Sequence, residues 1–391
     1  MSKRKLWIIS ELFYPEESTT AYILTEISRI LSEDFEVHAI AGTPVYEINN
    51  PIQQLNNVTI HRIKSKKIDK NNIISRLQRA LLLCLGIKKF INKNIKQNDL
   101  VLMVTNPVFN TLFLPKVLKR KRIDTTLLVH DIFPENTLEA GIFSSNLIYQ
   151  FIKKLFDSSY SSVSRCVVLG RDMSEVIKKK TNNVIPIQII ENWADVERIL
   201  PKIKKDNLNK IVLKFSGNIG RVQGLEKLFC IIKQVVNKNL LFVFAGKGAL
   251  LNKLKQLKDE LKLDNVLFED AYSKENEINV LNNCDISLIS LGASMYGLGV
   301  PSKSYNCMAV GKPLLYIGPE NSEIYFEVIE NKIGWAFSPD DKELINFLNK
   351  LEASNPDFVL FSSNARKCAE EKYSKEIILN KYKNLFIGVS K

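Results

Sequence analysis

Short apolar runs alternate with helix-length amphipathic segments along almost all of this 391-residue chain, and this alternation restricts the fold more than any other feature. Short apolar runs bounded by polar residues are typical of strands buried on both faces. In the first half such runs lie at 5–10, 36–41, 58–63, 100–105, 126–130, 166–169 and 187–190, with helices expected at 20–31 and 171–180. Strands that alternate with helices predict βα units around a parallel sheet, and therefore an α/β fold.

The alternation stops once, between residues 192 and 206. There Asn-Trp-Ala-Asp at 192–195 is followed by Pro201 and a lysine-rich stretch, a composition typical of an exposed linker. Beyond it we expect strands at 211–216, 241–245, 266–269, 285–289 and 313–317, helices at 225–236, 250–261, 275–282 and 304–309, and a last helix at 374–386. The sequence thus predicts two doubly wound halves, with domains at 1–195 and 196–373 and a C-terminal helix within 374–391.

Composition is typical of a soluble globular protein. The apolar share of 45% and the charged share of 25% are ordinary. No stretch approaches the roughly 18 apolar residues that a membrane-spanning helix needs, and the apolar run at 6–9 is too short for the core of a signal peptide. We therefore expect a cytoplasmic protein.

The cysteines and histidines argue against a disulfide framework or a zinc site. The six cysteines show no Cys-x-x-Cys spacing, as expected for reduced thiols, and the chain has only three histidines, His38, His61 and His130. No Asp-x-Asp follows a predicted strand to hold a divalent ion, and no Ser-His-Asp or Cys-His arrangement is readable. We expect no metal site, no cofactor and no covalent acyl chemistry.

The net charge of +13 is concentrated in one segment. Residues 61–122 hold 16 Lys and Arg against 2 acidic residues, a local balance of +14. Such a block suits nucleic acid, an anionic bilayer or an acidic substrate, or it is a solvated basic face. Because aromatic residues are few there and no nucleic-acid-binding module is recognisable, we expect a basic surface patch and no nucleic-acid partner.

Residues 72–91 within this segment are predicted to form an amphipathic helix. Ile74, Leu77, Leu81 and Leu85 recur at helical spacing, and four basic residues lie near them: Arg76, Arg79, Lys88 and Lys89. Such a helix can lie in a membrane interface, with its apolar stripe in the acyl boundary and its charges on anionic headgroups. The alternative is a core-packed helix of the first domain with a basic outer face.

The run at 298–313, Leu-Gly-Val-Pro-Ser-Lys-Ser-Tyr-Asn-Cys-Met-Ala-Val-Gly-Lys-Pro, carries the strongest functional pattern. It follows an apolar run and opens a predicted helix, so it lies at the carboxyl end of a strand, where open α/β sheets bind ligands. Gly297 and Gly299 allow close backbone approach, Ser302 is placed as an N-cap, and Lys303 adds charge beside the free N–H groups of the helix start. These features predict a phosphate-bearing ligand, the alternative being an ordinary strand–loop–helix corner.

The pattern Pro-Ser-Lys, two residues, a polar residue and Cys-Met-Ala-x-Gly-Lys-Pro resembles the donor-binding segment of family-4 glycosyltransferases. The resemblance is greatest to the branch that assembles bacterial surface polysaccharides, which includes fucosamine transferases. Other parts of the family pattern follow in the same order along the chain: Phe-Tyr-Pro-Glu at 13–16, His-Asp-Ile-Phe-Pro at 130–134, Glu-Asn-Trp-Ala-Asp at 191–195, Ser-Gly-Asn-Ile-Gly at 216–220, Gln-Gly at 223–224 and Ala-Gly-Lys-Gly at 245–248. The resemblance spans nearly all 391 residues.

This resemblance implies the GT-B architecture, in which two Rossmann-like domains face each other and a C-terminal helix crosses back to the first. The first domain would bind the acceptor and the second the nucleotide sugar. It implies a retaining, metal-independent hexosyltransferase that moves a sugar from a UDP-sugar to a lipid-linked saccharide in O-antigen, capsule or exopolysaccharide synthesis. Such an enzyme would be peripherally associated with the inner face of the bacterial cell membrane.

The resemblance also implies which residues bind the donor. These are Gly217, Asn218, Arg221, Gly246, Lys247, Tyr272, Gly299, Ser302, Lys303 and Asn306. In the turn after the predicted strand 211–216, the glycines can bring backbone N–H groups against a phosphate and Arg221 can add charge, although a solvent-facing arginine is the alternative.

The chain departs from the family pattern at several of these positions. Asn218 and Gln223 stand where the family often has an arginine and a lysine, and Asn306 stands where a glutamate commonly holds the ribose hydroxyls. A second family glutamate upstream of Pro301 has no counterpart. An amide can accept one hydroxyl proton but lacks the charge-assisted bond of a carboxylate, which leaves a less active enzyme open.

The first domain supplies the predicted catalytic residues. His130 and Asp131 end an apolar strand, and the resemblance implies that the histidine lies beside the donor sugar and the phosphate, where imidazole can donate a hydrogen bond to developing charge. Glu135 on the next turn is a candidate acceptor contact. Ser18 and Thr19, where the family usually has glycines, are further cleft candidates, and Thr19 is alternatively the N-cap of the next helix.

Two other functions are compatible with the sequence. One is a catalytically weak GT-B subunit that binds a nucleotide sugar, which Asn306 and the missing upstream glutamate suggest. The other is a UDP-sugar epimerase of the same fold. Because such an epimerase needs several carboxylates and histidines in its cleft, the total of three histidines argues against it.

Overall fold

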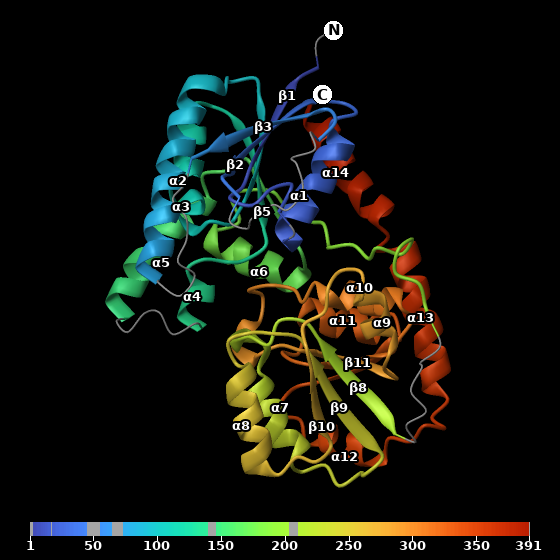
Figure 1. Cartoon of the computed structure of the whole chain (residues 1–391). Helices are drawn as coiled ribbons and strands as arrows, with labels where there is room; N and C mark the ends of the chain where they lie inside the picture. Colours follow the sequence, from blue (N-terminus) through green and yellow to red (C-terminus); the bar gives the residue numbers. More distant parts are fainter. Residues whose placement is uncertain are drawn as a thin grey trace. The chain divides into compact units, whose positions relative to one another are not determined.

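The structure is a computed structural model that describes residues 3–16, 18–44, 55–64, 73–139, 146–202 and 210–390. The chain divides into two compact units (Figure 1). The first unit comprises Met1–Leu169, Met173–Ile190 and Leu379–Lys391, and the second comprises Gly170–Asp172 and Glu191–Ile378. The main division falls before Glu191 rather than after residue 195, because the Ala194 N–H donates to the Tyr373 carbonyl at 2.7 Å and ties this stretch to the second unit. Residues 203–206 of the predicted linker lie outside the described residues.

The described residues of the first unit are built on a parallel sheet of seven strands. Its strands are β1 (Lys5–Ile9), β2 (Glu36–Gly42), β3 (Val58–Ile63), β4 (Leu100–Val104), β5 (Asp124–Val129), β6 (Arg165–Val168) and β7 (Ile187–Ile189), in the order β3-β2-β1-β4-β5-β6-β7. β4 is buried along its whole length, as its unbroken apolar sequence predicts for a central parallel strand.

Helices cover both faces of this sheet. Their bounds are α1 (Thr19–Leu31), α2 (Ile73–Asn94), α3 (Val108–Arg120), α4 (Glu135–Glu139), α5 (Asn146–Tyr160), α6 (Arg171–Lys180) and α14 (Lys375–Ser390). α2, α3 and α5 lie side by side on one face, and α1 and α14 lie on the other (Figure 1). α14 packs on this unit through Phe386, whose ring centroid lies 6.4 Å from that of Phe35, and through Lys383, whose ammonium pairs with Glu33.

The second unit repeats the same plan, with six parallel strands in its described part. These are β8 (Ile211–Ser216), β9 (Leu240–Ala245), β10 (Val266–Glu269), β11 (Ile286–Ser290), β12 (Leu314–Ile317) and β13 (Gly334–Phe337), in the order β10-β9-β8-β11-β12-β13. Its core includes the clustered rings of Phe215, Phe229, Phe242 and Phe244.

The helical segments of the second unit fill the connections between its strands and follow the last strand. They are η1 (Arg221–Gln223), α7 (Leu225–Ile232), α8 (Leu251–Leu261), α9 (Glu277–Asn282), η2 (Ala293–Met295), α10 (Lys303–Ala309), α11 (Glu323–Glu330), α12 (Lys342–Lys350) and α13 (Asp357–Glu371). α7 ends at Ile232, four residues before its predicted end. β13 and the helices α11 to α13 were not predicted. β13 is a half-buried edge strand that begins at Gly334, and glycine is unfavourable in a strand.

Two doubly wound α/β units are therefore present, as the alternation predicted. In each sheet the strand order reverses beside the first strand, between β1 and β4 and between β8 and β11. Open parallel sheets bind ligands at the carboxyl ends of the strands beside such a reversal. Among the described helices, none is long and apolar enough to cross a bilayer.

Candidate functional site

Two glycine turns of the second unit are packed directly against each other. Gly217 follows β8 with φ +152°, and Gly246 follows β9 with φ +147°. The Gly217 N–H donates to the Ala245 carbonyl at 2.9 Å, and the Ile219 N–H donates to the Lys247 carbonyl at 2.9 Å. These two N–H groups are committed within the protein, so they are not available to a phosphate. Side chains beside the turns can supply positive charge.

Gly246→Ala is expected to destabilise the second unit by roughly 2–6 kcal/mol, the sum of a strained backbone and an overpacked contact. A Cβ atom at Gly246 would lie 1.9 Å from the carbonyl oxygen of Gly217. Because the contacted atoms belong to the backbone, no side-chain rotation can relieve this overlap. Chemical denaturation monitored by circular dichroism measures the loss. Gly388→Ala in α14 is the matched control, because nothing lies within 4 Å of its added Cβ. Equal stability of Gly246→Ala and wild type would contradict this packing.

Lys303 lies beside these turns, at the first position of α10. A Cβ added to Gly217 would meet its Cγ at 3.6 Å, so two motifs far apart in the sequence are adjacent in the fold. Its ammonium lies 3.1 Å from Oε1 of Glu277 and 5.5 Å from the centroid of the Tyr272 ring. The side chain is 41% exposed, which leaves it accessible to a ligand. Burial would lower the pKa of Lys303, but Tyr272 and Glu277 outweigh it, so the pKa is raised and the group stays charged.

Glu277, the first residue of α9, is the acidic centre of this cluster and was not predicted. It is buried, and its carboxylate accepts from Lys303, from Asn306 Nδ2 at 3.1 Å and from Arg198 Nη2 at 2.7 Å. Burial would raise the pKa of Glu277, yet the charges of Lys303 and Arg198 hold it below its ordinary value. Glu277 thus places a carboxylate beside Asn306, the position where the family pattern has its own glutamate.

The remaining donor candidates surround this cluster with different degrees of exposure. Asn218, Arg221 and Lys247 are exposed, and Gly299 is half-buried. The Tyr272 hydroxyl is buried and has no hydrogen-bond partner among the described residues, and burial raises its pKa. A ligand that supplies a polar atom there would satisfy it.

Two details of these loops differ from the sequence-based expectation. Ser302 occupies the N-cap position of α10 but makes no side-chain cap hydrogen bond, because its backbone is already helical; instead the Ser304 hydroxyl donates to the Pro301 carbonyl at 2.7 Å. Gln223 does not extend toward a ligand, since its amide oxygen accepts from the Gly220 N–H at 3.0 Å. The Gln223 side chain therefore stabilises its own turn, and Ser304 rather than Ser302 makes the side-chain bond at the start of α10.

In the first unit, His130 and Asp131 directly follow β5 at the carboxyl edge of the sheet. The Thr105 hydroxyl, at the end of β4, accepts from both of their backbone N–H groups at 3.2 Å. The Nε2 atom of His130 is closed to solvent and lacks a hydrogen-bond partner among the described residues. Burial lowers the pKa of His130 to about 4, so its imidazole is neutral at pH 7. The Asp131 side chain is exposed, but nearby protein atoms displace water from it and raise its pKa. A hydrogen bond from Asn136 at 2.9 Å lowers this pKa by a smaller amount.

The other first-unit candidates have internal partners. Ser18 is the N-cap of α1, and its hydroxyl accepts a hydrogen bond from the Ala21 N–H at 3.1 Å. The alternative prediction of Thr19 as the N-cap is therefore wrong, because Thr19 is the first residue of the helix. Glu135 accepts from the Lys180 ammonium at 2.7 and 2.9 Å through its two oxygens. The negative charge of Glu135 is therefore balanced by a buried lysine of α6, and its carboxylate is engaged in an internal ion pair.

The other two histidines belong to an aromatic cluster. Trp7 stacks on His38 with 4.4 Å between ring centroids, and His38 Nδ1 lies 3.2 Å from His61 Nε2. Both histidines lie within strands β2 and β3, not after them. Of the three histidines, His130 is thus the one that directly follows a strand.

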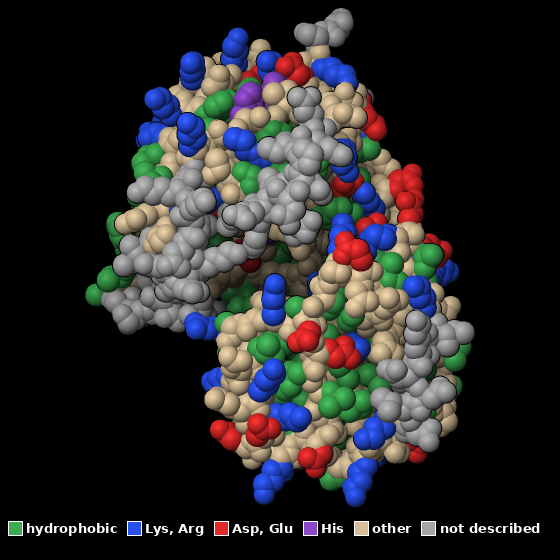
Figure 2. Space-filling view, viewed as in Figure 1, with side chains coloured by type: hydrophobic (Ala, Val, Ile, Leu, Met, Phe, Trp, Pro, Cys, Tyr) green, Lys and Arg blue, Asp and Glu red, His purple; other side chains and the backbone are tan. Residues whose placement is uncertain are grey.

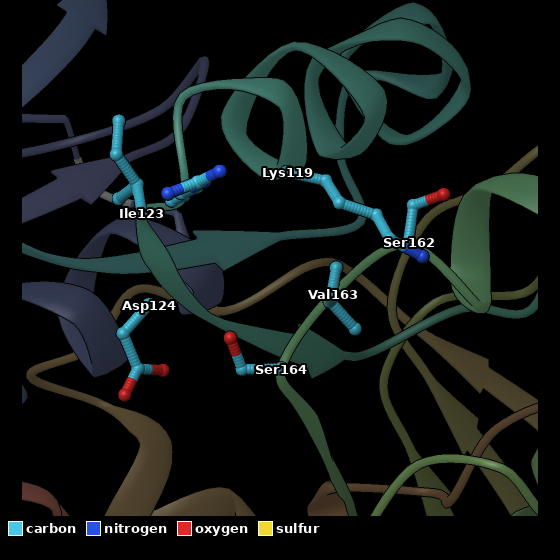
Figure 3. A pocket seen from close by; sticks show the side chains of 7 residues that line it. Lys119, Ile123, Asp124, Ser162, Val163 and Ser164 are labelled. Carbon is cyan, nitrogen blue, oxygen red and sulfur yellow. The ribbon is translucent and has the colours of Figure 1, made fainter. Parts of the chain in front are cut away.

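A separate pocket of about 370 Å³ lies at the amino ends of β5 and β6, the edge of the sheet opposite His130 (Figure 3). The side chain of Lys119 extends from α3 toward Ser162 in this view. Its lining residues are Lys119, Arg122, Ile123, Asp124, Ser162, Val163 and Ser164. Because these strands present their carboxyl ends elsewhere, this pocket is separate from the candidate site.

Residues 196–368 match the family model described as Glycosyl transferases group 1. Over nearly its whole length the chain is similar to the probable glycosyltransferase WbjE of Pseudomonas aeruginosa, with 29% identity across 97% of this chain and 96% of that protein.

Solved structures share the fold at low sequence identity. Sucrose-phosphate synthase from Thermosynechococcus elongatus has a TM-score of 0.77 at 13% identity, covering 99% of each chain. Anabaena Alr3699/HepE in complex with UDP-glucose has a TM-score of 0.70 at 14% identity, covering 98% of this chain and 99% of that one. These shared folds confirm the predicted GT-B fold class.

Proposed function

We propose that the protein is a retaining glycosyltransferase that moves a sugar from a UDP-sugar to a lipid-linked saccharide. The observation that carries this proposal is the cluster of Lys303, Glu277 and Asn306 beside the Gly217 turn in the second unit. It combines a half-exposed cation with a buried carboxylate and an amide, the groups needed for a diphosphate and for sugar hydroxyls.

Each member of the cluster has a distinct role in donor binding. The Lys303 ammonium pairs with the diphosphate, while Glu277 accepts hydrogen bonds from the ribose hydroxyls and the amide of Asn306 makes a further one. Arg198 stays on the far oxygen of Glu277, at 2.7 Å, and fixes the carboxylate. The UDP-glucose complex of the structurally similar Anabaena protein supports UDP as the nucleotide.

Transfer is proposed to proceed without a metal ion. The leaving diphosphate gains negative charge in the transition state, and preorganised cations that meet this charge lower the barrier. Lys303 supplies one cation, and the exposed Arg221 and Lys247 beside the two glycine turns are available to supply others. His130 donates a hydrogen bond from its neutral imidazole in the reacting complex, which gives its Nε2 atom the partner that it lacks.

The acceptor and the cellular role rest on the charge of the first unit. Residues 61–122 carry a balance of +14, which suits the anionic surface on which a lipid-linked saccharide is held. We place the reaction at the inner face of the cell membrane in bacterial O-antigen, capsule or exopolysaccharide synthesis, as the resemblance to the family-4 polysaccharide branch implies.

The two alternatives have less support. A catalytically weak binding subunit was suggested by Asn306, but Glu277 provides a carboxylate beside that position. A UDP-sugar epimerase needs several histidines in its cleft, whereas His38 and His61 pack together in the aromatic cluster of the first unit.

Incubation with a panel of nucleotide sugars and a bacterial lipid extract tests the function. We expect UDP release that depends on added extract, persists in a metal chelator, and yields a product with the donor's anomeric configuration. Interconversion of free UDP-sugars without acceptor would favour the epimerase instead. Tight UDP-sugar binding with no release across the whole panel would favour the binding subunit.

A further inference from the structure

Among the described side chains of the adjacent helices α2, α3 and α5 of the first unit, eight large apolar ones are exposed. On α5, Leu147, Ile148 and Phe151 are 83%, 57% and 64% exposed. The others are Leu77, Leu81, Leu82 and Leu85 on α2 and Phe113 on α3. We call these eight residues the apolar patch. Residue 72 and the side chains of Ile74 and Arg76, which belong to the predicted amphipathic helix, lie outside the described residues.

The fold gathers the apolar patch at one end of the helix layer. α2, α3 and α5 each start after a strand has ended and run back to precede the next strand, so their first turns lie at the carboxyl edge of the sheet. The patch occupies the first two-thirds of each helix or less, and α3 packs against both α2 and α5. The apolar stretches of the three helices therefore lie toward the edge of the sheet at which His130 follows β5.

The later turns of the same helices are basic. The exposed face of α2 changes from leucines to Lys88, Lys89 and Lys93, and α3 ends in Lys119 and Arg120. The three helices together contain 10 Lys and Arg and 1 acidic residue. That acid, Asp157, is already paired with Lys153 and Lys180. Figure 2 shows hydrophobic side chains along the left margin of this unit, with Lys and Arg above them.

This distribution of charge selects the occupant of the surface. A second copy docked on the same face would bring two basic helix layers together, which like-charge repulsion opposes. An anionic bilayer offers both an acyl boundary for the leucine and phenylalanine side chains and negative headgroups for the lysines. Large apolar side chains that stay exposed on neighbouring helices are also a mark of an interaction site.

We propose that the apolar patch inserts into the headgroup–acyl boundary of an anionic membrane while the basic turns of α2 and α3 contact the headgroups. This inference rests on the proposed function, in which the acceptor is carried on a lipid. It brings the membrane to the carboxyl edge of the first sheet, so that a lipid-linked saccharide reaches the His130 side of this unit without leaving the bilayer.

Vesicle flotation of the full chain tests the surface directly. We expect wild type to bind vesicles of phosphatidylglycerol and phosphatidylethanolamine, to bind phosphatidylcholine vesicles weakly, and to release as salt rises. The triple variant Leu81→Gln, Leu147→Gln, Phe151→Gln should bind anionic vesicles at least roughly tenfold more weakly. Three apolar side chains that would move from water into the membrane interface are then absent. Phe151→Trp should show a blue-shifted indole emission on anionic vesicles.

Matched controls separate insertion from general effects. Val359→Gln with Leu360→Gln changes two exposed apolar residues of α13 in the second unit and should leave vesicle binding unchanged. The triple variant should keep wild-type affinity for UDP, because its three residues lie outside the donor cluster. Wild-type vesicle binding by the triple variant would overturn the proposal. So would a wild-type dimer in sedimentation that the triple variant dissolves, since the occupant would then be a second copy.

Failure of the proposed function gives a different result. If no nucleotide sugar supports transfer while flotation still depends on the apolar patch, the membrane surface stands and the glycosyltransferase assignment falls. If transfer to a water-soluble saccharide is normal in wild type and in the triple variant, but neither floats with vesicles, the membrane surface is wrong and the function stands.

Discussion

Replacing Lys303 with alanine is expected to weaken UDP binding by roughly 10- to 150-fold, because a hydrogen bond to a charged group is worth about 1.5–3 kcal/mol. The ammonium lies over Tyr272 and against the Gly217 turn, and it is the half-exposed cation of the donor cluster. Calorimetric titration with UDP measures the change. Lys227→Ala is the matched control, since Lys227 is also a lysine of the second unit in an ion pair, with Asp340 on an exposed surface.

Glu277→Gln gives a second, linked measurement. We expect it to weaken UDP binding as well, because the amide no longer fixes Lys303 and Asn306 through a shared oxygen and no longer offers a charged acceptor to the ribose. The double variant should lose less than the two single losses combined, since both changes act on one contact network. Equal UDP affinity of wild type and Lys303→Ala would remove Lys303 from the site. Tighter binding by Glu277→Gln would mean that the carboxylate only competes with phosphate for the lysine.

The sequence predicted most strands of both sheets because a strand buried on both faces is a short, continuous apolar run that can be recognised locally. The run Ile211–Ser216 is apolar, bounded by polar residues and buried at every position, and the structure gives it the predicted bounds. The amphipathic segment Arg171–Lys180 likewise forms a helix with the predicted bounds. By contrast, β13 pairs only with β12 at the sheet edge among the described strands, and its half-buried sequence begins with glycine, which is depleted in strands.

The candidate site was predictable where a short motif contains the chemistry. Lys303 and Gly217 each belong to such a motif, and the fold brings them together. Glu277 was missed because it precedes Lys303 by 26 residues on another helix, and an acidic residue in a first helical turn is common for dipole reasons alone. A search of the β10–β11 connection for a carboxylate to replace the one absent at Asn306 would have found it.

Glu135 shows the opposite limit of sequence reasoning. Its place after His130 and Asp131 suggested a contact with the acceptor, but its charge is met by Lys180, which lies 45 residues further along the chain. A chain with 55 Lys and Arg offers many partners to any carboxylate, and only the tertiary structure selects one. Buried ion pairs of this kind depend on geometry that no local spacing encodes.

His130→Ala is expected to lower kcat by roughly 100-fold or more while changing the KM for the UDP-sugar much less. A donor aimed at developing charge contributes mainly in the transition state, so its loss lowers turnover more than it weakens ground-state binding. Steady-state kinetics with saturating acceptor measures both constants. His130→Gln should recover part of the lost kcat, because its amide keeps an N–H near the position of Nε2. A normal kcat with a raised KM in His130→Ala would make the histidine a ground-state contact.

The pH dependence of stability gives an independent readout for His130. Its pKa of about 4 in the folded protein lies below the value of about 6.5 for an exposed histidine, so the unfolded chain binds the proton more readily. The stabilisation from a neutral, buried imidazole is therefore complete above about pH 6.5 and is lost as the pH falls toward 4. His130→Ala removes this titration, so the loss of thermal stability between about pH 7 and pH 5 should be smaller than in wild type. An equal loss in both proteins would mean that the pKa of His130 is close to that of an exposed histidine. Its imidazole would then be largely protonated near pH 6, and the proposed role of a neutral imidazole would be wrong at that pH.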